Sequence, residues 1–403
     1  MAKVKPFRAV RADKNDIHQV ITRSYDTYSN EEINSIISDN SKSFLQIIHP
    51  FFKENTFKTI DDKFDAVKNK YVSFKENKIF QKDEKPMYYL YKKETAIGDF
   101  IGIIAAASTK DYKKNRIKKH EKTLKKREIL FKNYLKKTGF NAEPVLLTYP
   151  DNDKIDKIIS IYQDKEPEYQ FTTNNLKTHT LWLINNPQDI QIIKKEFKQI
   201  DALYIADGHH RSASSYLLSK ELKTKSSKYF LSYLISESNL KIASFNRLVK
   251  TLNNLSEDEF LKKISRTFSI KLLQDVVFEP KHSHQFSMYL GKNTYVLELK
   301  KESYRFKNSL HHLDTHILYK NIIKKVLGIE NVRTDKRIDY IAQEKGQEYL
   351  KNQVIQGEYR VAFGLFPVTI QQMKEISDDG LTMPPKSTYI LPKLKSGLLI
   401  YEF

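Results

Sequence analysis

The stretch ALYIADGHHRSAS, residues 202–214, contains the local pattern from which the fold class follows. Its apolar run Ala202–Ala206 predicts a buried strand, and the Asp-Gly pair that follows predicts a tight turn. The next residues, Ser212–Leu222, have the composition of a helix. A strand, a turn and a helix in direct succession indicate an α/β protein, so we expect mixed sheets with packed helices.

Chemically active side chains are concentrated in this turn. Backbone N–H groups at the start of a helix, together with the helix dipole, favour a phosphate. Gly208 allows a close approach of the backbone, Arg211 can form two hydrogen bonds to phosphate oxygens, and Asp207 can hold a divalent metal or accept a proton. The alternative is an ordinary Asp-Gly turn whose histidines cap the helix. We assign catalysis to Asp207, His209 and His210, and phosphate binding to Gly208, Arg211 and Ser212.

The segment Arg116–Thr123 contains two more candidates. Glu121 is a candidate general base, and His120 is a candidate ligand of the phosphate or nucleotide. We expect a long basic helix over residues 118–137, on which Glu121 and Lys118 are three residues apart. An ordinary surface ion pair is therefore an equal alternative for Glu121.

Two other segments each contain one candidate ligand of an anion. His179 lies at the expected start of a strand, close to the only tryptophan, Trp182, and it is either a phosphate ligand or a core histidine. Consecutive prolines at 384–385 exclude a helix and predict an ordered extended loop that carries Lys386. This loop, with Lys393 further on, suits either closure over an anionic ligand or a purely structural role.

A cluster of histidines at 311–316 is the last candidate. His312 and His316 have the i, i+4 spacing that can share a metal, on a helix expected over Leu313–Val326. Helix capping and ion pairing are the alternative, and we favour it because the sequence does not establish the carboxylate ligand or the open geometry of a metal site.

Composition limits the classes of protein that remain. At 403 residues the chain exceeds one average domain, so we expect one unit over 1–403, either undivided or built from two closely packed lobes of about residues 1–250 and 251–403. Cysteine is absent, which excludes thiolate nucleophiles, disulfides and cysteine-based metal sites.

The expected elements include strands at Val4–Val10, Met87–Tyr91 and Phe100–Ala107.

The net charge of +20 would ordinarily suggest a nucleic-acid partner. Most of the 69 basic residues are lysines that are interspersed with acids, however, so we expect solvated faces and no nucleic-acid binding. The N-terminus lacks a secretory signal, and no apolar run approaches the ~18 residues of a membrane span. We therefore expect a cytoplasmic protein without membrane attachment.

The chain resembles, nearly end to end, the bacterial and archaeal family known as domain of unknown function 1015, sometimes labelled ParB-like. The turn also resembles the phosphate-binding turn of the ParB/sulfiredoxin superfamily, which includes free serine kinases with a similar Asp-Gly-x-His-Arg. One departure is Thr22-Arg23-Ser24, where the family usually carries prolines before the tyrosine. The family resemblance rests on Lys5-Pro6-Phe7-Arg8, Ser24-Tyr25-Asp26, Ile117 through Glu121, His179 through Trp182, Tyr204 through Arg211, Arg333-Thr334-Asp335, and Met383 through Lys386.

The resemblance implies a ParB/sulfiredoxin-like core with elaborations, and a kinase that binds ATP or ADP with Mg²⁺. The phosphates would lie on the Gly208–Arg211 turn, and the acceptor would be a small hydroxylated molecule such as L-serine. Asp207 or Glu121 would take the hydroxyl proton, with Asp207 as metal ligand, while Arg211 and the histidines would stabilise the transferring phosphoryl group. No Walker sequence occurs, so a P-loop mechanism is excluded.

Two other functions remain open at this stage. A nucleotide-binding regulator of ParB type would need a concentrated basic face on a helix-turn-helix, which the sequence does not show. A phosphohydrolase could use the same turn, and it would differ from a kinase in the nucleotide dependence of its turnover. The sequence also leaves a homo-oligomer open.

Overall fold

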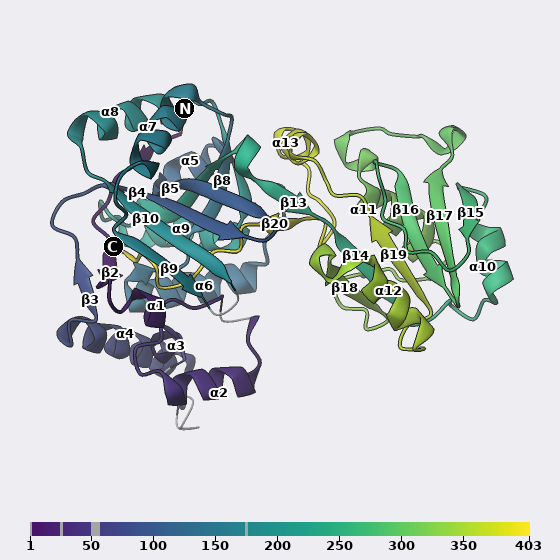
Figure 1. The fold of residues 1–403 in the computed structure, drawn as a ribbon, viewed down its shortest axis with the longest axis horizontal. Coiled ribbons are helices and arrows are strands. Elements are labelled where there is room, and N and C mark those ends of the chain that lie inside the picture. Colours follow the sequence, from purple (N-terminus) through teal and green to yellow (C-terminus); the bar gives the residue numbers. More distant parts are fainter. Residues whose placement is uncertain (1, 25–26, 50–56, 174–175) are drawn as a thin grey trace. The chain divides into compact units, whose positions relative to one another are not determined.

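The computed structural model describes residues 2–24, 27–49, 57–173 and 176–403. These residues form two compact units (Figure 1). Unit 1 comprises residues up to Lys119, Thr123–Leu240 and Pro392–Phe403; unit 2 comprises His120–Lys122 and Lys241–Leu391. Tyr25 and Asp26, part of the family resemblance, lie outside the described residues.

Unit 1 is built on a mixed nine-stranded sheet. Strand β11 is parallel to β6, and β12 is parallel to β8, whereas the other pairs are antiparallel. The apolar, β-branched and aromatic content of these segments suits buried strands. The strands follow in the order β6 (Ile117–Lys118), β11 (Leu203–Asp207), β8 (Val145–Tyr149), β12 (Tyr229–Ser236), β5 (Gly98–Ser108), β4 (Tyr88–Thr95), β10 (Lys177–Ile184) and β9 (Tyr169–Thr173), with β1 (Val4–Lys5) paired to β5.

Helices bury the apolar core of unit 1 against one face of this sheet. Alternate residues of the strands, such as Leu90 and Ile103, meet apolar side chains of four helices, and α7 packs beside α8 (Figure 1). These four helices are α5 (Thr109–Lys113), α7 (Asp153–Gln163), α8 (Pro187–Phe197) and α9 (His209–Leu222). The remaining elements are α1 (Ile17–Val20), α2 (Asn30–Asp39), α3 (Leu45–Ile48), α4 (Ile60–Glu76), α6 (Lys125–Thr138), β2 (Val10–Ala12), β3 (Phe80–Lys82), β7 (Phe140–Asn141) and β21 (Tyr401–Glu402).

Close packing at Gly102 in β5 leads to a first prediction. A Cβ atom built on Gly102 would lie 2.3 Å from the backbone oxygen of Leu234 and 2.9 Å from the Tyr233 ring. The backbone oxygen cannot move aside without disturbing the sheet, so Gly102→Ala should destabilise the protein by about 1–3 kcal/mol. Urea unfolding monitored by circular dichroism measures this, and an unchanged midpoint would contradict the close approach.

A second prediction concerns the C-terminal strand β21, where Glu402 accepts hydrogen bonds from Tyr71, Lys75 and Lys82 at 2.7–2.8 Å. Burial raises the pKa of Glu402, but these partners lower it more, to about 2. A lowered carboxyl pKa stabilises the fold above the unfolded value of about 4.3, and this stability is lost as the pH falls toward 2.

Glu402→Gln should therefore destabilise the protein by about 1–2 kcal/mol at pH 7. This is less than the shift in pKa alone implies, because both lysines are partly exposed and solvent screens their charges. The variant should lose less stability than the wild type between pH 5 and about pH 3. Urea unfolding of both proteins across this range provides the measurement. Identical pH dependence of the two proteins would show that Glu402 is not the group responsible.

Unit 2 is an antiparallel six-stranded sheet with helices on both faces. The larger core packs α10 (Glu257–Ile264), α11 (Asp314–Leu318) and the π-helical turn Tyr319–Lys324 on one face, and α12 (Gly346–Ile355) covers part of the other. The strand order is β15 (Phe268–Leu273), β17 (Asn293–Leu299), β16 (Gln285–Leu290), β19 (Val361–Leu365), β14 (Phe245–Val249) and β18 (Ile338–Ala342); β13 (Lys241–Ala243) pairs with β20 (Tyr389–Leu391), and α13 (Ile370–Asp378) completes the unit.

The mixed α/β class is confirmed, but three expected elements differ. The expected strand Val4–Val10 is divided between β1 and β2. The helix expected from residue 118 begins only at Lys125, because Ile117 and Lys118 pair with β11 and the chain must then leave the sheet. His120 and Glu121 consequently lie in a loop. The expected helix Leu313–Val326 changes from α11 to a π-helical turn at Tyr319.

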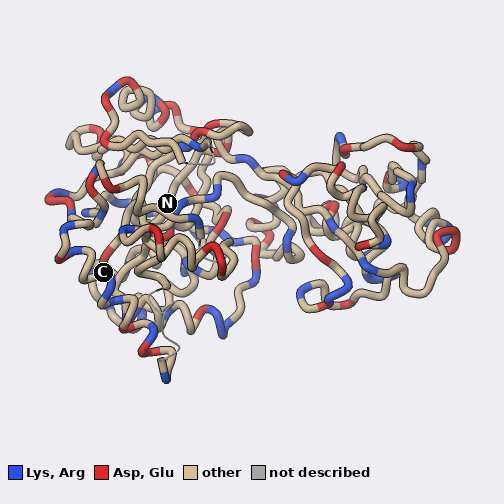
Figure 2. Tube along the Cα trace, turned by 60° about the horizontal axis from the view of Figure 1, so that its bottom comes forward, with Lys and Arg blue, Asp and Glu red and all other residues tan. Residues whose placement is uncertain are grey.

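The charged residues have the mixed distribution expected from the sequence. Lys and Arg are interspersed with Asp and Glu along the trace of each unit (Figure 2). Within the described part of the chain, no helix combines the length and the apolar character needed to cross a bilayer.

Candidate functional site

The predicted strand, turn and helix form the centre of the candidate site in unit 1. Strand β11 ends at Asp207, and α9 begins at His209. Between them Gly208 has φ = 99°, a left-handed conformation that glycine adopts at little cost. The N-cap residue Gly208 makes no side-chain cap hydrogen bond to α9. This is the geometry that favours a phosphate.

Asp207 is held as a carboxylate at the edge of this turn. Its oxygens lie 3.0 Å from Nζ of Lys393 and 3.5 Å from Nη2 of Arg211, and 38% of its side chain is exposed. Desolvation raises the pKa of Asp207, but Lys393 and Arg211 lower it more, to about 2. The carboxylate is therefore ionised at neutral pH, which suits a ligand of a cation or an acceptor of a hydrogen bond.

Arg211 connects the turn with the loop before β8. Its Nη1 group donates to the carboxylate of Glu143 and to the carbonyl oxygen of Pro144, the latter at 2.9 Å. A Cβ atom on Gly208 would lie 2.9 Å from Nε of Arg211, so the glycine also makes room for the guanidinium. Arg211 is thus fixed beside the helix terminus, with 26% of its side chain exposed.

The two histidines and the serine of the turn differ in their surroundings. His209 is buried, and burial lowers its pKa to about 3 despite the opposite effect of Asp207, so the imidazole is neutral. His210 is half-buried. The hydroxyl of Ser212 donates to the carbonyl oxygens of Gly208 and His209, at 3.3 and 3.0 Å, and is thus directed at its own helix.

His179 lies in the same unit, on β10. Its Nδ1 atom is 2.6 Å from the hydroxyl oxygen of Tyr91, and its ring stacks on Phe171. Burial, together with the positive charges of Lys395 and Lys93, lowers the pKa of His179 to about 3. His179 is therefore a neutral buried histidine among cations. Its burial fits a core histidine, and the surrounding cations fit a ligand of an anion, which were the two interpretations that the sequence left open.

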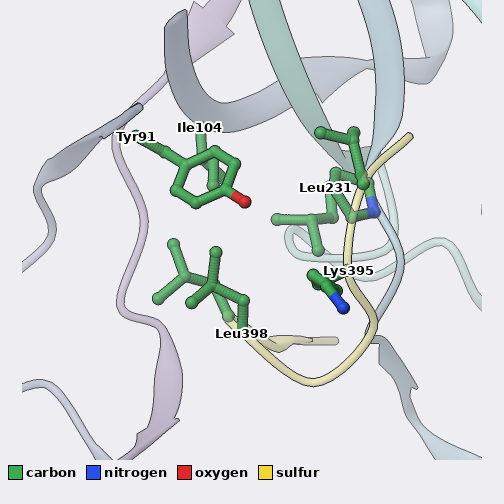
Figure 3. Close-up of a pocket in the computed structure, with 8 residues that line it drawn as sticks. Tyr91, Ile104, Leu231, Lys395 and Leu398 are labelled. Carbon is green, nitrogen blue, oxygen red and sulfur yellow. The ribbon is translucent and has the colours of Figure 1, made fainter. Parts of the chain in front are cut away.

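The C-terminal segment Pro392–Leu398 brings two lysines to unit 1, of which the sequence indicated only Lys393. Lys393, noted as a companion of the proline loop, pairs with Asp207, and its carbonyl oxygen accepts a hydrogen bond from Lys93 at 2.6 Å. Lys395, which was missed, lines a cavity together with Tyr91 and Pro144 (Figure 3).

Three predicted site residues, the candidate base Glu121 and the candidate ligands His120 and Lys386, belong to unit 2 and not to the unit of the turn. His120 is buried, its carbonyl oxygen accepts a hydrogen bond from Met383, and Glu121 beside it is exposed. Lys386 has φ = 55° and places its Nζ atom 4.8 Å from the ring centre of Phe245.

The histidine cluster of unit 2 does not have the arrangement that the i, i+4 spacing suggested. His316 is in α11, whereas His312 precedes that helix. The His316 ring stacks on His311, with the ring centres 4.9 Å apart. Within the described residues, neither His312 nor His316 belongs to a group of three side chains that could hold a metal. This supports the alternative without a metal.

Comparison with known proteins establishes the family. Residues 4–316 match the family described as "Protein of unknown function (DUF1015)". The match covers more than half of the chain, so the chain belongs to this family, as the sequence resemblance predicted. No curated protein matches.

Several solved structures are similar at low identity. SbnI from Staphylococcus aureus, with a C-terminal truncation, is 13% identical; the match covers 73% of this chain and 87% of that chain, with a TM-score of 0.39. A single-residue mutant of a free serine kinase, in complex with AMP, is 14% identical; the match covers 70% of this chain and 89% of that chain, with a TM-score of 0.36. A conserved hypothetical protein from Pyrococcus furiosus is 13% identical, covering 70% and 93%, with a TM-score of 0.33.

Proposed function

We propose that this protein transfers a phosphoryl group from ATP or ADP to the hydroxyl group of a small metabolite. The observation that carries the proposal is the convergence, in one turn, of a helix N-terminus without a side-chain cap, a fixed guanidinium and an ionised carboxylate. Phosphoryl transfer depends on positioning and electrostatic stabilisation, which these groups supply. L-Serine is the first acceptor to test, because the turn resembles that of free serine kinases.

The phosphates of the nucleotide would lie on Gly208–Arg211. The helix dipole and the N–H groups at the start of α9 favour negative charge there. The planar guanidinium of Arg211 can form two parallel hydrogen bonds to phosphate oxygens. Its bonds to Glu143 and Pro144 fix its position beforehand, so less side-chain entropy is lost when the phosphate binds.

Asp207 would hold and orient the reacting groups. A carboxylate together with phosphate oxygens and water is the ligand set that Mg²⁺ usually takes, and the exposed, ionised Asp207 fits this set. When bound, the metal ion would neutralise charge on the phosphates. The same carboxylate can accept a hydrogen bond from the acceptor hydroxyl. A pKa of about 2 makes it a weak proton acceptor, so its proposed role is to orient the hydroxyl.

The neutral imidazole of His209 would complete the site. A neutral imidazole can donate one hydrogen bond to a developing negative charge without adding a proton to the reaction. His209 is neutral at physiological pH and directly follows Gly208, so its N–H group suits this role better than a charged side chain would.

The test is turnover of ATP and of ADP by the purified full chain with Mg²⁺, against a panel of hydroxylated metabolites that includes L-serine. Phosphorus NMR identifies the product. Acceptor-dependent formation of a phosphate ester supports the proposal. Nucleotide hydrolysis without transfer would favour a phosphohydrolase, and tight nucleotide binding without turnover would favour a ParB-like regulator; either result would overturn the kinase.

A further inference from the structure

A second group of polar side chains in unit 1 gathers on the sheet face opposite the helical core. We call Tyr91, Lys93, Lys177, His179 and Lys395 the basic pocket; of these residues, Tyr91 and Lys395 line the cavity. Tyr91 and Lys93 are alternate residues of β4, Lys177 and His179 are alternate residues of β10, and His179 is opposite Lys93 in the ladder. Because side chains alternate between faces, these four lie on one face, and Lys395 comes from the C-terminal segment.

His179 has a hydrogen-bonding atom that lacks a partner. The residue is 1% exposed, and its buried Nε2 atom has no hydrogen bond among the described residues. Burial keeps the Tyr91 hydroxyl protonated by raising its pKa, and this hydroxyl can satisfy its proton by donating to Nδ1. Nε2 then carries the imidazole proton, which makes it a buried donor. An unsatisfied buried donor costs free energy that a ligand oxygen would recover.

Lys395 supplies a partly buried charge at the same place. Burial lowers its pKa to about 8, and the other described groups that shift it, Lys177 and Arg23, are also cations. The described charges that act on His179 are likewise lysines. Positive charge gathered in a partly buried region is unfavourable without an anion. The cavity lined by Tyr91, Leu231, Leu398 and Lys395 adjoins this charge (Figure 3).

The basic pocket is connected to the Asp207 turn by direct contacts. Lys93 donates to the carbonyl oxygen of Lys393, whose side chain pairs with Asp207 at 3.0 Å. Pro144 lines the cavity and accepts a hydrogen bond from Arg211. Lys395 follows Lys393 by two residues, which span at most about 7 Å of backbone. One short stretch of backbone, Pro392–Lys395, therefore joins the two places.

We propose that the basic pocket binds the carboxylate group of the phosphoryl acceptor, which makes the acceptor a small hydroxy acid or hydroxyamino acid. This inference rests on the proposed function, because it places the acceptor hydroxyl at Asp207. A carboxylate has two oxygens, one for the Nε2–H group of His179 and one for the ammonium group of Lys395. A phosphate is better served by the turn itself, where N–H groups and a guanidinium converge.

Isothermal titration calorimetry on the full chain tests the pocket. The probes are L-serine and D-glycerate, which carry a hydroxyl and a carboxylate, serinol, which lacks the carboxylate, and inorganic phosphate. The test variant is Lys395→Met, which keeps the length of the side chain. The matched control is Lys132→Met on α6, which removes an ammonium group that pairs with Glu221. Thermal unfolding verifies that both variants fold.

We expect both carboxylates to bind the wild type and serinol to bind at least about 10-fold more weakly, since a charge-assisted hydrogen bond is lost. Lys395→Met should weaken carboxylate binding about 10-fold to 100-fold, whereas ADP binding should not change. Lys132→Met should change neither. Equal binding of serinol and L-serine, undiminished carboxylate binding by Lys395→Met, or no carboxylate binding at millimolar concentration would overturn the inference. So would phosphate binding that is tighter than carboxylate binding and depends on Lys395.

The same variants separate the two proposals. If carboxylate binding needs Lys395 but no phosphoryl transfer occurs, the proposal of the basic pocket is supported and the proposal of a kinase is wrong. Phosphoryl transfer to serinol with the same kcat/KM as to L-serine would keep the kinase and reject the basic pocket.

Discussion

Asp207→Asn should lower kcat for phosphoryl transfer by about 10²-fold to 10⁴-fold, the range found when an acid or base in direct contact with reacting groups is removed. Asparagine keeps the size of the side chain but loses the negative charge that Lys393 and Arg211 now compensate. Binding of the metal and of the acceptor hydroxyl should both weaken. Steady-state kinetics with ATP, ADP and the acceptor that the panel of hydroxylated metabolites yields measure the loss.

The control is Asp189→Asn on α8, which removes an acid of the same unit that accepts a hydrogen bond from Tyr162. It should leave kcat unchanged. Stability should change little in Asp207→Asn, by less than about 1 kcal/mol, because the carboxylate is partly exposed. Transfer at the wild-type rate by folded Asp207→Asn would remove this residue from the mechanism.

The turn could be predicted from sequence because its signals are local. An apolar run, an Asp-Gly pair and a helical composition follow one another within 21 residues, from Ala202 to Leu222. The helix begins at His209 and not at Ser212, because the left-handed conformation of Gly208 alone completes the change of direction. The histidines therefore lie within the first helical turn, where the sequence had placed them in a longer loop.

The basic pocket could not be predicted because its residues come from three distant segments. Lys93 and Lys395 are separated by 302 positions, and nothing local distinguishes them from the other lysines of a lysine-rich chain. Only the pairing of β4 with β10, and the return of the chain at Pro392 to unit 1, brings them together. Glu143 was missed for the same reason, since its pairing with Arg211 is a long-range contact.

The helix expected from residue 118 shows how a long-range contact overrides local propensity. Lys and Glu favour helices, and the composition of residues 118–137 fits one. Strand β6 nevertheless forms at Ile117–Lys118, because β11 offers a parallel edge to it. The helix then begins at Lys125. The hydroxyl of Thr123, which precedes the helix, donates a hydrogen bond to the carboxylate of Glu128 in its first turn. Propensity therefore determined where the helix ends, at Gly139, but not where it starts.

Arg211→Lys should weaken nucleotide binding about 10-fold to 100-fold, because lysine keeps the charge but cannot form two parallel hydrogen bonds to a phosphate. It should also release Glu143, since one ammonium group cannot keep the bonds to Glu143 and Pro144 while it meets the ligand. Calorimetric titration with ATP and ADP measures the change. The matched control is Arg360→Lys in unit 2, where an exposed arginine pairs with Glu257 at 3.8 Å, and it should bind nucleotide as the wild type does. Wild-type affinity in folded Arg211→Lys would show that the guanidinium does not meet the phosphates and would move the nucleotide away from this turn.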